Sequence, residues 1–154
     1  MKKFALAILC AAISTSAFAG KEEDQQIKVR QSAYTFMAWN VGKIKAQVID
    51  RPEAYDKNQV IAAANAIAAV ANSGLSVLFG PGTDQGTGWK KTRLKPEFFK
   101  QPDEVRKLAT DFNREANELA KVAQGGNVGD IKAQFGKLGE ACKACHDKFR
   151  VKED

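Results

Sequence analysis

The sequence lacks any apolar run long enough to cross a membrane. Its longest such run, residues 4–13, falls short of the roughly 20 apolar residues that a bilayer span requires. Because Lys2 and Lys3 precede this run and small residues ending at Ala19 follow it, the segment is typical of a cleaved secretory signal peptide. We predict residues 1–19 to be a signal peptide and residues 20–154 to be one exported, periplasmic domain with no membrane anchor.

A strong excess of charge is also absent. Removing residues 1–19 takes away two of the 24 basic residues and none of the 18 acidic ones, which leaves a formal net charge of +4. So small an excess, scattered along the sequence, does not favour nucleic acid as a partner. We interpret the charged residues as a solvated surface.

Cysteine and histidine are scarce as well. Of the three cysteines, Cys10 falls in the predicted signal peptide, without the small residue before it that lipid attachment requires. The exported chain keeps Cys142 and Cys145, and its single histidine, His146, follows them directly.

The apolar residues of the exported chain recur with helical spacing, and we find no convincing strand. Four amphipathic helices are predicted, beginning near Asp24, Asp56, Pro102 and Asn127 or Asp130 and ending near Val48, Val77, Gly125 and Phe149. The single long connection runs from Phe79 to about Lys95. The predicted fold class is therefore all-α, an antiparallel four-helix bundle.

Cys142, Cys145 and His146 occupy positions i, i+3 and i+4 of the last predicted helix, so they project from one side of it. This spacing suits covalent attachment of one haem c, with two thioethers and an imidazole as axial iron ligand. Three other interpretations are weaker. A disulfide between the two cysteines is sterically poor on a continuous helix, a redox dithiol should follow a strand, and zinc needs about four ligands.

Two arginines are candidate haem contacts. Arg30 occupies a position in the apolar seam of the first helix, where a guanidinium needs a partner; a haem propionate would satisfy it, and so would an extended conformation that reaches solvent. Arg150, four residues after His146, either borders the proximal side of the haem or only favours the negative end of the helix dipole.

The sixth iron position decides between two functions. Tyr34 and Met37 lie one turn apart on the first helix. A methionine ligand would give a six-coordinate, low-spin electron carrier, whereas a tyrosine that only covers the iron would leave it five-coordinate and open to gases. Each side chain could also be ordinary core packing.

The sequence resembles the cytochromes c′ over essentially the whole exported chain. Three motifs carry the resemblance: RQSA at residues 30–33, FGPGT at 79–83, and CKACH at 142–146 with Arg150. The resemblance implies a dimeric, non-enzymatic periplasmic haem protein with high-spin, five-coordinate iron that binds nitric oxide and carbon monoxide. It further implies that Arg30 and Gln31 contact the propionates and that Tyr34 is the distal residue.

The loop from Asp84 to Lys95 is longer than is usual in that family, and Thr87 and Arg93 are its candidate haem contacts. Phe36 and Trp39 lie off the first apolar seam and could form a homodimer interface or only extend the core. From these features we expect a protein that traps nitric oxide and exchanges electrons with redox partner proteins; the alternative is an electron carrier that uses Met37.

Overall fold

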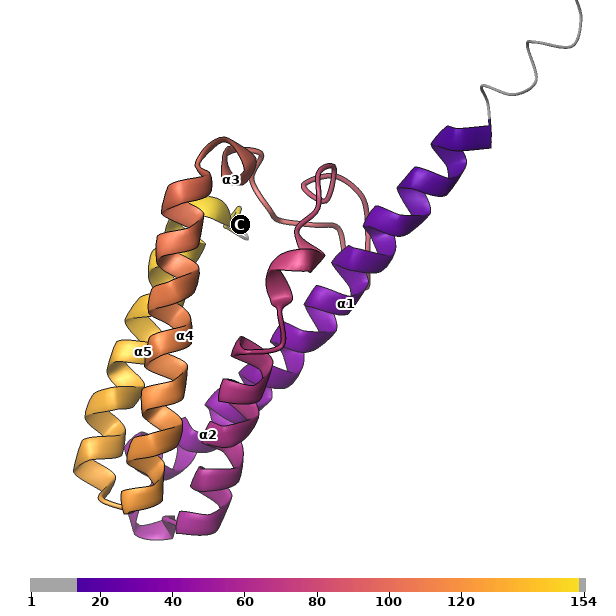
Figure 1. The fold of residues 1–154 in the computed structure, drawn as a ribbon. Helices are drawn as coiled ribbons and strands as arrows, with labels where there is room; N and C mark the ends of the chain where they lie inside the picture. The colour runs from indigo at the N-terminus through magenta and orange to yellow at the C-terminus, as the bar shows by residue number, and fades with distance from the viewer. Residues whose placement is uncertain (1–13, 153–154) are drawn as a thin grey trace, which may run out of the picture.

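The computed structural model describes residues 14–152, and all regular elements in this range are helices (Figure 1). Four long helices form an antiparallel bundle, which confirms the predicted fold class. They are α1 (Ser14–Lys45), α2 (Lys57–Ala71), α4 (Pro102–Gly125) and α5 (Val128–Phe149). The shorter elements are η1 (Ala46–Asp50), η2 (Pro52–Ala54), η3 (Leu75–Leu78) and α3 (Glu97–Lys100). None of the helices in the described range is both long and apolar enough to cross a membrane.

The predicted signal peptide lies mostly outside the described residues, and it stays a prediction.

Side-chain caps begin two of the helices where the sequence indicated. Asp56 accepts hydrogen bonds from the backbone N–H of Gln59 at 3.1 Å and from the Gln59 side-chain amide at 3.1 Å, so Asp56 is the N-cap of α2. Asn127 accepts from the N–H of Asp130 at 3.1 Å, so Asn127 is the N-cap of α5 and Asp130 lies in its first turn.

The predicted end of the second helix is wrong. Helix α2 stops at Ala71, and Gly74 adopts the left-handed conformation with φ +78° before the 3₁₀ turn η3 begins. Glycine takes this conformation without the penalty of a Cβ. Val77, which we expected in the second apolar seam, is therefore 74% exposed.

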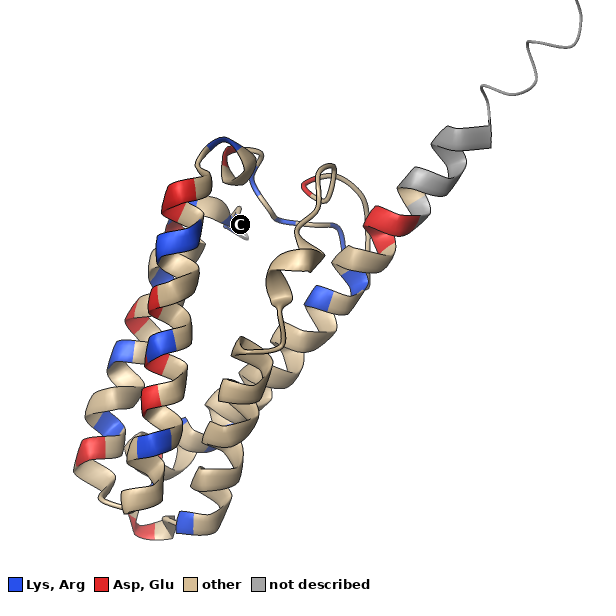
Figure 2. Ribbon diagram, viewed as in Figure 1, with Lys and Arg blue, Asp and Glu red and all other residues tan. Residues whose placement is uncertain are grey.

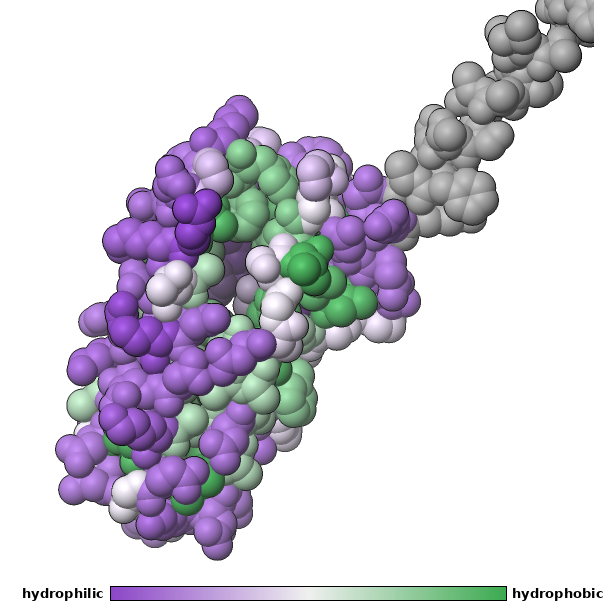
Figure 3. All heavy atoms as spheres, in the orientation of Figure 1, coloured by the Kyte–Doolittle hydropathy of each residue, from purple (hydrophilic) through white to green (hydrophobic). Residues whose placement is uncertain are grey.

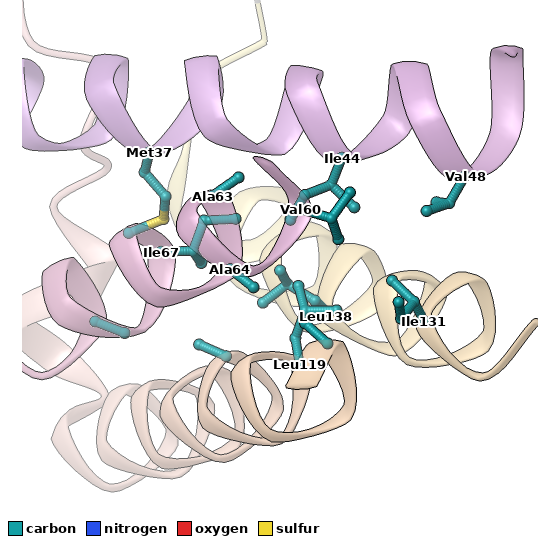
Figure 4. Packing of buried hydrophobic residues seen from close by; sticks show 13 residues of the cluster. Met37, Ile44, Val48, Val60, Ala63, Ala64, Ile67, Leu119, Ile131 and Leu138 are labelled. Atoms are coloured by element: carbon teal, nitrogen blue, oxygen red, sulfur yellow. The ribbon is translucent and has the colours of Figure 1, made fainter. Parts of the chain in front are cut away.

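The apolar core lies where all four helices converge (Figure 4). Alanines of α2 and α4, whose small side chains let two helices approach closely, alternate with larger aliphatic residues. Met37 of α1 points toward Ala63 and Ile67 of α2 in this core. The buried members are Met37, Ile44, Val48, Val60, Ala63, Ala64, Ile67, Ala71, Ala116, Leu119, Ala123, Ile131 and Leu138.

The bundle is tight at one end and spread at the other. Helix α5 packs against α4 and against η1, while α1 packs against α2 and η3. As a result α1 and α5 come together near η1, which we call the closed end, and separate toward the opposite end, which we call the open end (Figure 1).

Residues 79–95 form a strap that crosses the open end from α1 to the end of α5. On the α5 side, the N–H of Lys95 donates to the carbonyl of Phe149 at 2.9 Å, and the N–H of Val151 donates to the carbonyl of Arg93 at 2.9 Å. On the α1 side, Gly88 lies so close that a Cβ there would meet the backbone N of Lys28 at 2.6 Å. The strap therefore joins the two helices that do not pack against each other at this end.

Candidate haem site

The two cysteines and the histidine lie in the last two turns of α5, at the open end. Cys142 and Cys145 are free thiols and half-buried, and His146 is exposed. A helix with this spacing presents all three side chains on one side. Within the described residues no cluster of three or more His, Cys, Asp or Glu side chains is arranged to hold a metal ion.

These groups are partly surrounded by protein. Burial raises the pKa values of the Cys142 and Cys145 thiols and lowers the pKa of His146, although His146 is exposed. Tyr34 of α1 is 39% exposed, yet burial, followed by the charges of Cys145 and Cys142, raises its pKa to about 12. Side chains that solvent reaches and that protein still surrounds are typical of a hollow, and Tyr34 is near enough to the thiols for their charges to act on it.

The space-filling view shows this hollow between the helices, with apolar surface along part of its wall (Figure 3). Two thiols three residues apart, an adjacent imidazole and an apolar wall are the features that a covalently attached haem requires. The residues present therefore fit the group. Bound there, haem would supply an iron atom that takes small gaseous ligands and changes oxidation state.

Met37 and Tyr34, the two candidates for the distal side of the iron, are in different environments. Met37 is 4% exposed and belongs to the apolar core. Tyr34, one turn nearer the open end, lies outside that core and borders the hollow. Tyr34 is close enough to the thiols for their charges to affect its pKa.

Arg30 is buried, as its position in the seam implied, but its hydrogen bonds go to the strap. Nη1 donates to the Leu78 carbonyl at 3.1 Å and to Thr83 Oγ1 at 2.8 Å; Nη2 donates to the Thr83 carbonyl at 2.6 Å and to Thr92 Oγ1 at 2.7 Å. The guanidinium carbon also lies 4.8 Å from the centre of the Phe79 ring. Neutral oxygens thus meet the need for a partner, and contact with a propionate stays a prediction.

Gln31 and Thr87 also serve the attachment of the strap to α1. The Gln31 amide donates to the Lys90 carbonyl at 2.9 Å and accepts from the N–H groups of Trp89 and Lys90 at 2.8 and 3.2 Å. The N–H of Thr87 donates to Asp24 at 2.7 Å, and the Thr87 side chain is exposed. Haem contacts by Gln31 and Thr87 stay predictions.

Arg93 and Arg150 lie near the end of α5. The charge of Arg93, second to burial, lowers the pKa of His146, so Arg93 is close to the imidazole. The last helix ends at Phe149, as predicted, and Arg150 follows it in an extended conformation with its backbone paired to Leu94. Its side chain is exposed.

Sequence analysis missed the residues that hold Arg30. Thr83 and Thr92 are both buried, and Thr92 Oγ1 donates to the Thr83 carbonyl at 3.1 Å. They come from a segment without periodicity, 53 and 62 residues from Arg30. Their only sequence signal is that Thr83 closes the FGPGT motif.

Comparison with known proteins agrees with this geometry. A family model described as Cytochrome C′ matches residues 25–150. The chain is 54% identical to a cytochrome c′ of Rhodocyclus tenuis over 133 residues, which cover 86% of this chain and 98% of the relative. A solved cytochrome c′ with an unusual ligand-controlled dimer dissociation is 51% identical, with a TM-score of 0.79, and the match covers 84% of this chain and 97% of that one.

Two more distant solved relatives carry gases. Both are cytochrome c′ variants of Alcaligenes xylosoxidans, one with bound nitric oxide and one with bound carbon monoxide. The nitric oxide complex is 29% identical to this chain, with a TM-score of 0.74, and the match covers 85% of this chain and 97% of that one. The carbon monoxide complex is 30% identical, with a TM-score of 0.73, and the match covers 84% of this chain and 97% of that one.

A four-helix bundle with a Cys-x-x-Cys-His motif at its open end defines a class of haem-binding helical proteins. Within that class, this chain belongs to the cytochrome c′ family. The members of this family are haem proteins and not enzymes, and membership implies a covalently bound haem c.

Proposed function

We propose that this protein is a periplasmic cytochrome c′ that holds one haem c per chain and captures nitric oxide or carbon monoxide at five-coordinate iron. Cys142 and Cys145 form the thioethers, and His146 supplies the axial ligand. The observation that carries the proposal is the separation of Met37 from the hollow: with this thioether in the apolar core, Tyr34 is left to face the site.

Tyr34 controls access to the iron in this proposal. Its ring comes from α1 on the far side of the hollow from the thiols. Its hydroxyl is protonated at neutral pH, as any phenol is, and the pKa raised to about 12 extends this state to higher pH. A neutral phenol can donate a hydrogen bond to a bound gas or block the position by its bulk. A small ligand that binds iron tightly displaces such a side chain, whereas a weaker ligand is excluded.

The nitric oxide and carbon monoxide complexes of the Alcaligenes xylosoxidans relatives support this choice of ligands. The six-coordinate electron carrier, our alternative, would require Met37 to leave a core position where it is 4% exposed, at a cost of about 2–4 kcal/mol.

The exported protein tests the proposal directly. Its mass under denaturing conditions should exceed that of residues 20–154 by one haem, and Cys142→Ala with Cys145→Ala should abolish the increase. The ferric EPR spectrum should be high-spin and the ferrous absorption spectrum should shift on addition of nitric oxide. Met37→Leu, which keeps the core volume, is the matched control and should leave both spectra unchanged. A low-spin spectrum that Met37→Leu converts to high-spin would overturn the proposal.

We also propose a homodimer formed through α1. Phe36 and Trp39 are 54% and 69% exposed on its outer surface, which is unusual for aromatic side chains of a single soluble chain. Sedimentation should give a dimer mass that Trp39→Glu reduces to that of a monomer. Because a relative shows ligand-controlled dimer dissociation and Tyr34 shares α1 with this surface, we expect carbon monoxide to weaken the dimer. A dimer unaffected by Trp39→Glu would place the interface elsewhere.

A further inference from the structure

The fold gathers positive charge that is scattered in the sequence. Two short segments, residues 90–95 and 150–152, contain six basic residues and no acidic one, and we call them together the basic rim. Backbone pairing brings them side by side: Leu94 pairs with Arg150, and Val151 donates to the carbonyl of Arg93 at 2.9 Å. In the sequence, Glu153 and Asp154 directly follow Lys152 and offset two of these six positive charges.

Much of this charge is directed to solvent. Lys90, Lys91, Arg150 and Lys152 are exposed, and the three lysines among them form no ion pair with any residue of the described range. Asp147 lies near Lys152 but is already paired with Lys143. Elsewhere basic and acidic side chains alternate and pair, as Lys121 does with Glu118 at 3.5 Å.

The basic rim borders the candidate haem site. Arg93 lies close enough to His146 for its charge to affect the imidazole, and Arg150 directly follows the helix that carries the two thiols. Figure 2 shows the basic segments of the strap following one another along the open end, with acidic segments on the neighbouring α1, α3 and start of α4. The run of basic residues therefore lies at the end of the molecule where the iron would lie.

A partner for this surface must be acidic, and the position of the rim indicates what it does. Clustered charge of one sign steers an oppositely charged protein toward its docking site. Gas capture at ferrous iron needs a source of electrons whenever the iron is oxidised, and a donor must approach the edge of the haem. A membrane surface is a poorer match, because such sites combine basic residues with a broad apolar face. At the rim only Val151 and the neighbouring Trp89 are large exposed apolar side chains among the described residues, whereas Phe36 and Trp39 belong to α1.

We propose that the basic rim is the docking surface for an acidic one-electron carrier protein. The reduced carrier transfers one electron to the ferric iron, so the carrier is oxidised and the iron becomes ferrous. This inference rests on the proposed function for the presence of haem, but it names a surface and a partner that gas binding does not require.

The test uses the full haem-loaded protein and a plant-type [2Fe–2S] ferredoxin, an acidic carrier with a potential of about −400 mV. Lys90→Glu with Lys152→Glu reverses one exposed charge in each segment of the rim. The control, Lys57→Glu with Lys132→Glu, reverses two exposed charges at the closed end and changes the net charge by the same amount. Lys57 begins α2 and Lys132 is the fifth residue of α5, so both lie near helix N-termini, where acidic residues are tolerated.

Stopped-flow absorption and NMR titration measure the two effects. The rate at which reduced ferredoxin reduces the wild type should fall steeply as salt is added, since screening shortens the range of the charges. The rim variant should react at least about tenfold more slowly at low salt, and the control within about twofold. Ferredoxin should also shift backbone NMR signals of residues 90–95 and 150–152 in the wild type and not in the rim variant.

Three results would overturn the inference: a wild-type rate independent of salt, equal rates for rim and control variants, or NMR shifts confined to other surfaces. Stronger binding of the rim to vesicles containing anionic phosphatidylglycerol than to ferredoxin would assign it to a membrane instead. Nitric oxide binding, measured separately, tests the proposed function: a rim variant that binds the gas normally but reacts slowly with ferredoxin separates the two.

Discussion

Replacing Arg30 with methionine should detach the strap from α1. The side chain is 5% exposed, and its two terminal nitrogens make four hydrogen bonds to Leu78, Thr83 and Thr92. A hydrogen bond to a charged group contributes about 1.5–3 kcal/mol. Counting one for each terminal nitrogen, because bonds that share a donor are not additive, gives a loss of about 3–6 kcal/mol.

Methionine keeps part of the apolar contact with Phe79, so we expect the lower part of that range, about 3 kcal/mol. A domain of this size is stable by about 5–15 kcal/mol, and 1 kcal/mol corresponds to about 4 °C in Tm. Urea unfolding followed by circular dichroism should show the lower stability, and the amides of Thr83 and Thr92 should exchange with deuterium much faster. Arg106→Met, at an exposed arginine paired with Asp103, is the control and should change stability by less than about 0.5 kcal/mol.

Arg30→Lys tests whether the main partner of the side chain at position 30 is the strap or a haem propionate. One ammonium group can pair with a carboxylate but cannot reproduce the fork that reaches both Thr83 and Thr92. We expect the lysine variant to lose most of the same stability. Full rescue by lysine, or a loss below about 1 kcal/mol for Arg30→Met, would refute the role that the hydrogen bonds indicate.

Three further predictions concern the strap, the core and the distal tyrosine. Gly88→Ala would place a Cβ 2.6 Å from the backbone N of Lys28, so the urea midpoint should fall by the equivalent of more than about 1 kcal/mol; Gly139→Ala, with nothing within 4 Å, should not lower it. Met37→Ala should cost about 2–4 kcal/mol in thermal unfolding while the iron stays high-spin by EPR. The pKa of Tyr34 in the folded protein is raised to about 12, so its contribution to stability is complete below pH 10 and is lost as the pH rises toward 12. Tyr34→Phe should therefore reduce the fall in the free energy of unfolding between pH 10 and 12. An unchanged slope would contradict the raised pKa.

Helical periodicity predicted the closed end well because burial there depends on local spacing. Ile44 and Val48 of the first seam, and Leu119 and Ile131 of the later ones, are all buried in one core. The caps at Asp56 and Asn127 were also predictable, since each acts on a backbone group three residues away. The error at the end of α2 has the same local origin. The apolar spacing in the sequence continues through Gly74, but the backbone leaves the helical conformation before that residue.

The open end was harder to predict because its contacts are long-range and follow no period. The sequence indicated that Arg30 needs a partner, and the partners are neutral oxygens 48 to 62 residues away. Gln31 binds backbone groups of residues 89 and 90, and any loop sequence offers such groups. The hollow itself follows from the spread of α1 and α5, which depends on how the whole bundle packs.

The division between a closed and an open end places the apolar core away from the side chain that faces the gas. Met37, the one core member that we considered as an iron ligand, is buried in that core, and Tyr34 is not a member of it. Exchanging the side chain that faces the gas could therefore retune ligand preference with little penalty in folding. Such an arrangement lets related chains diversify in what they bind while the same scaffold is inherited unchanged.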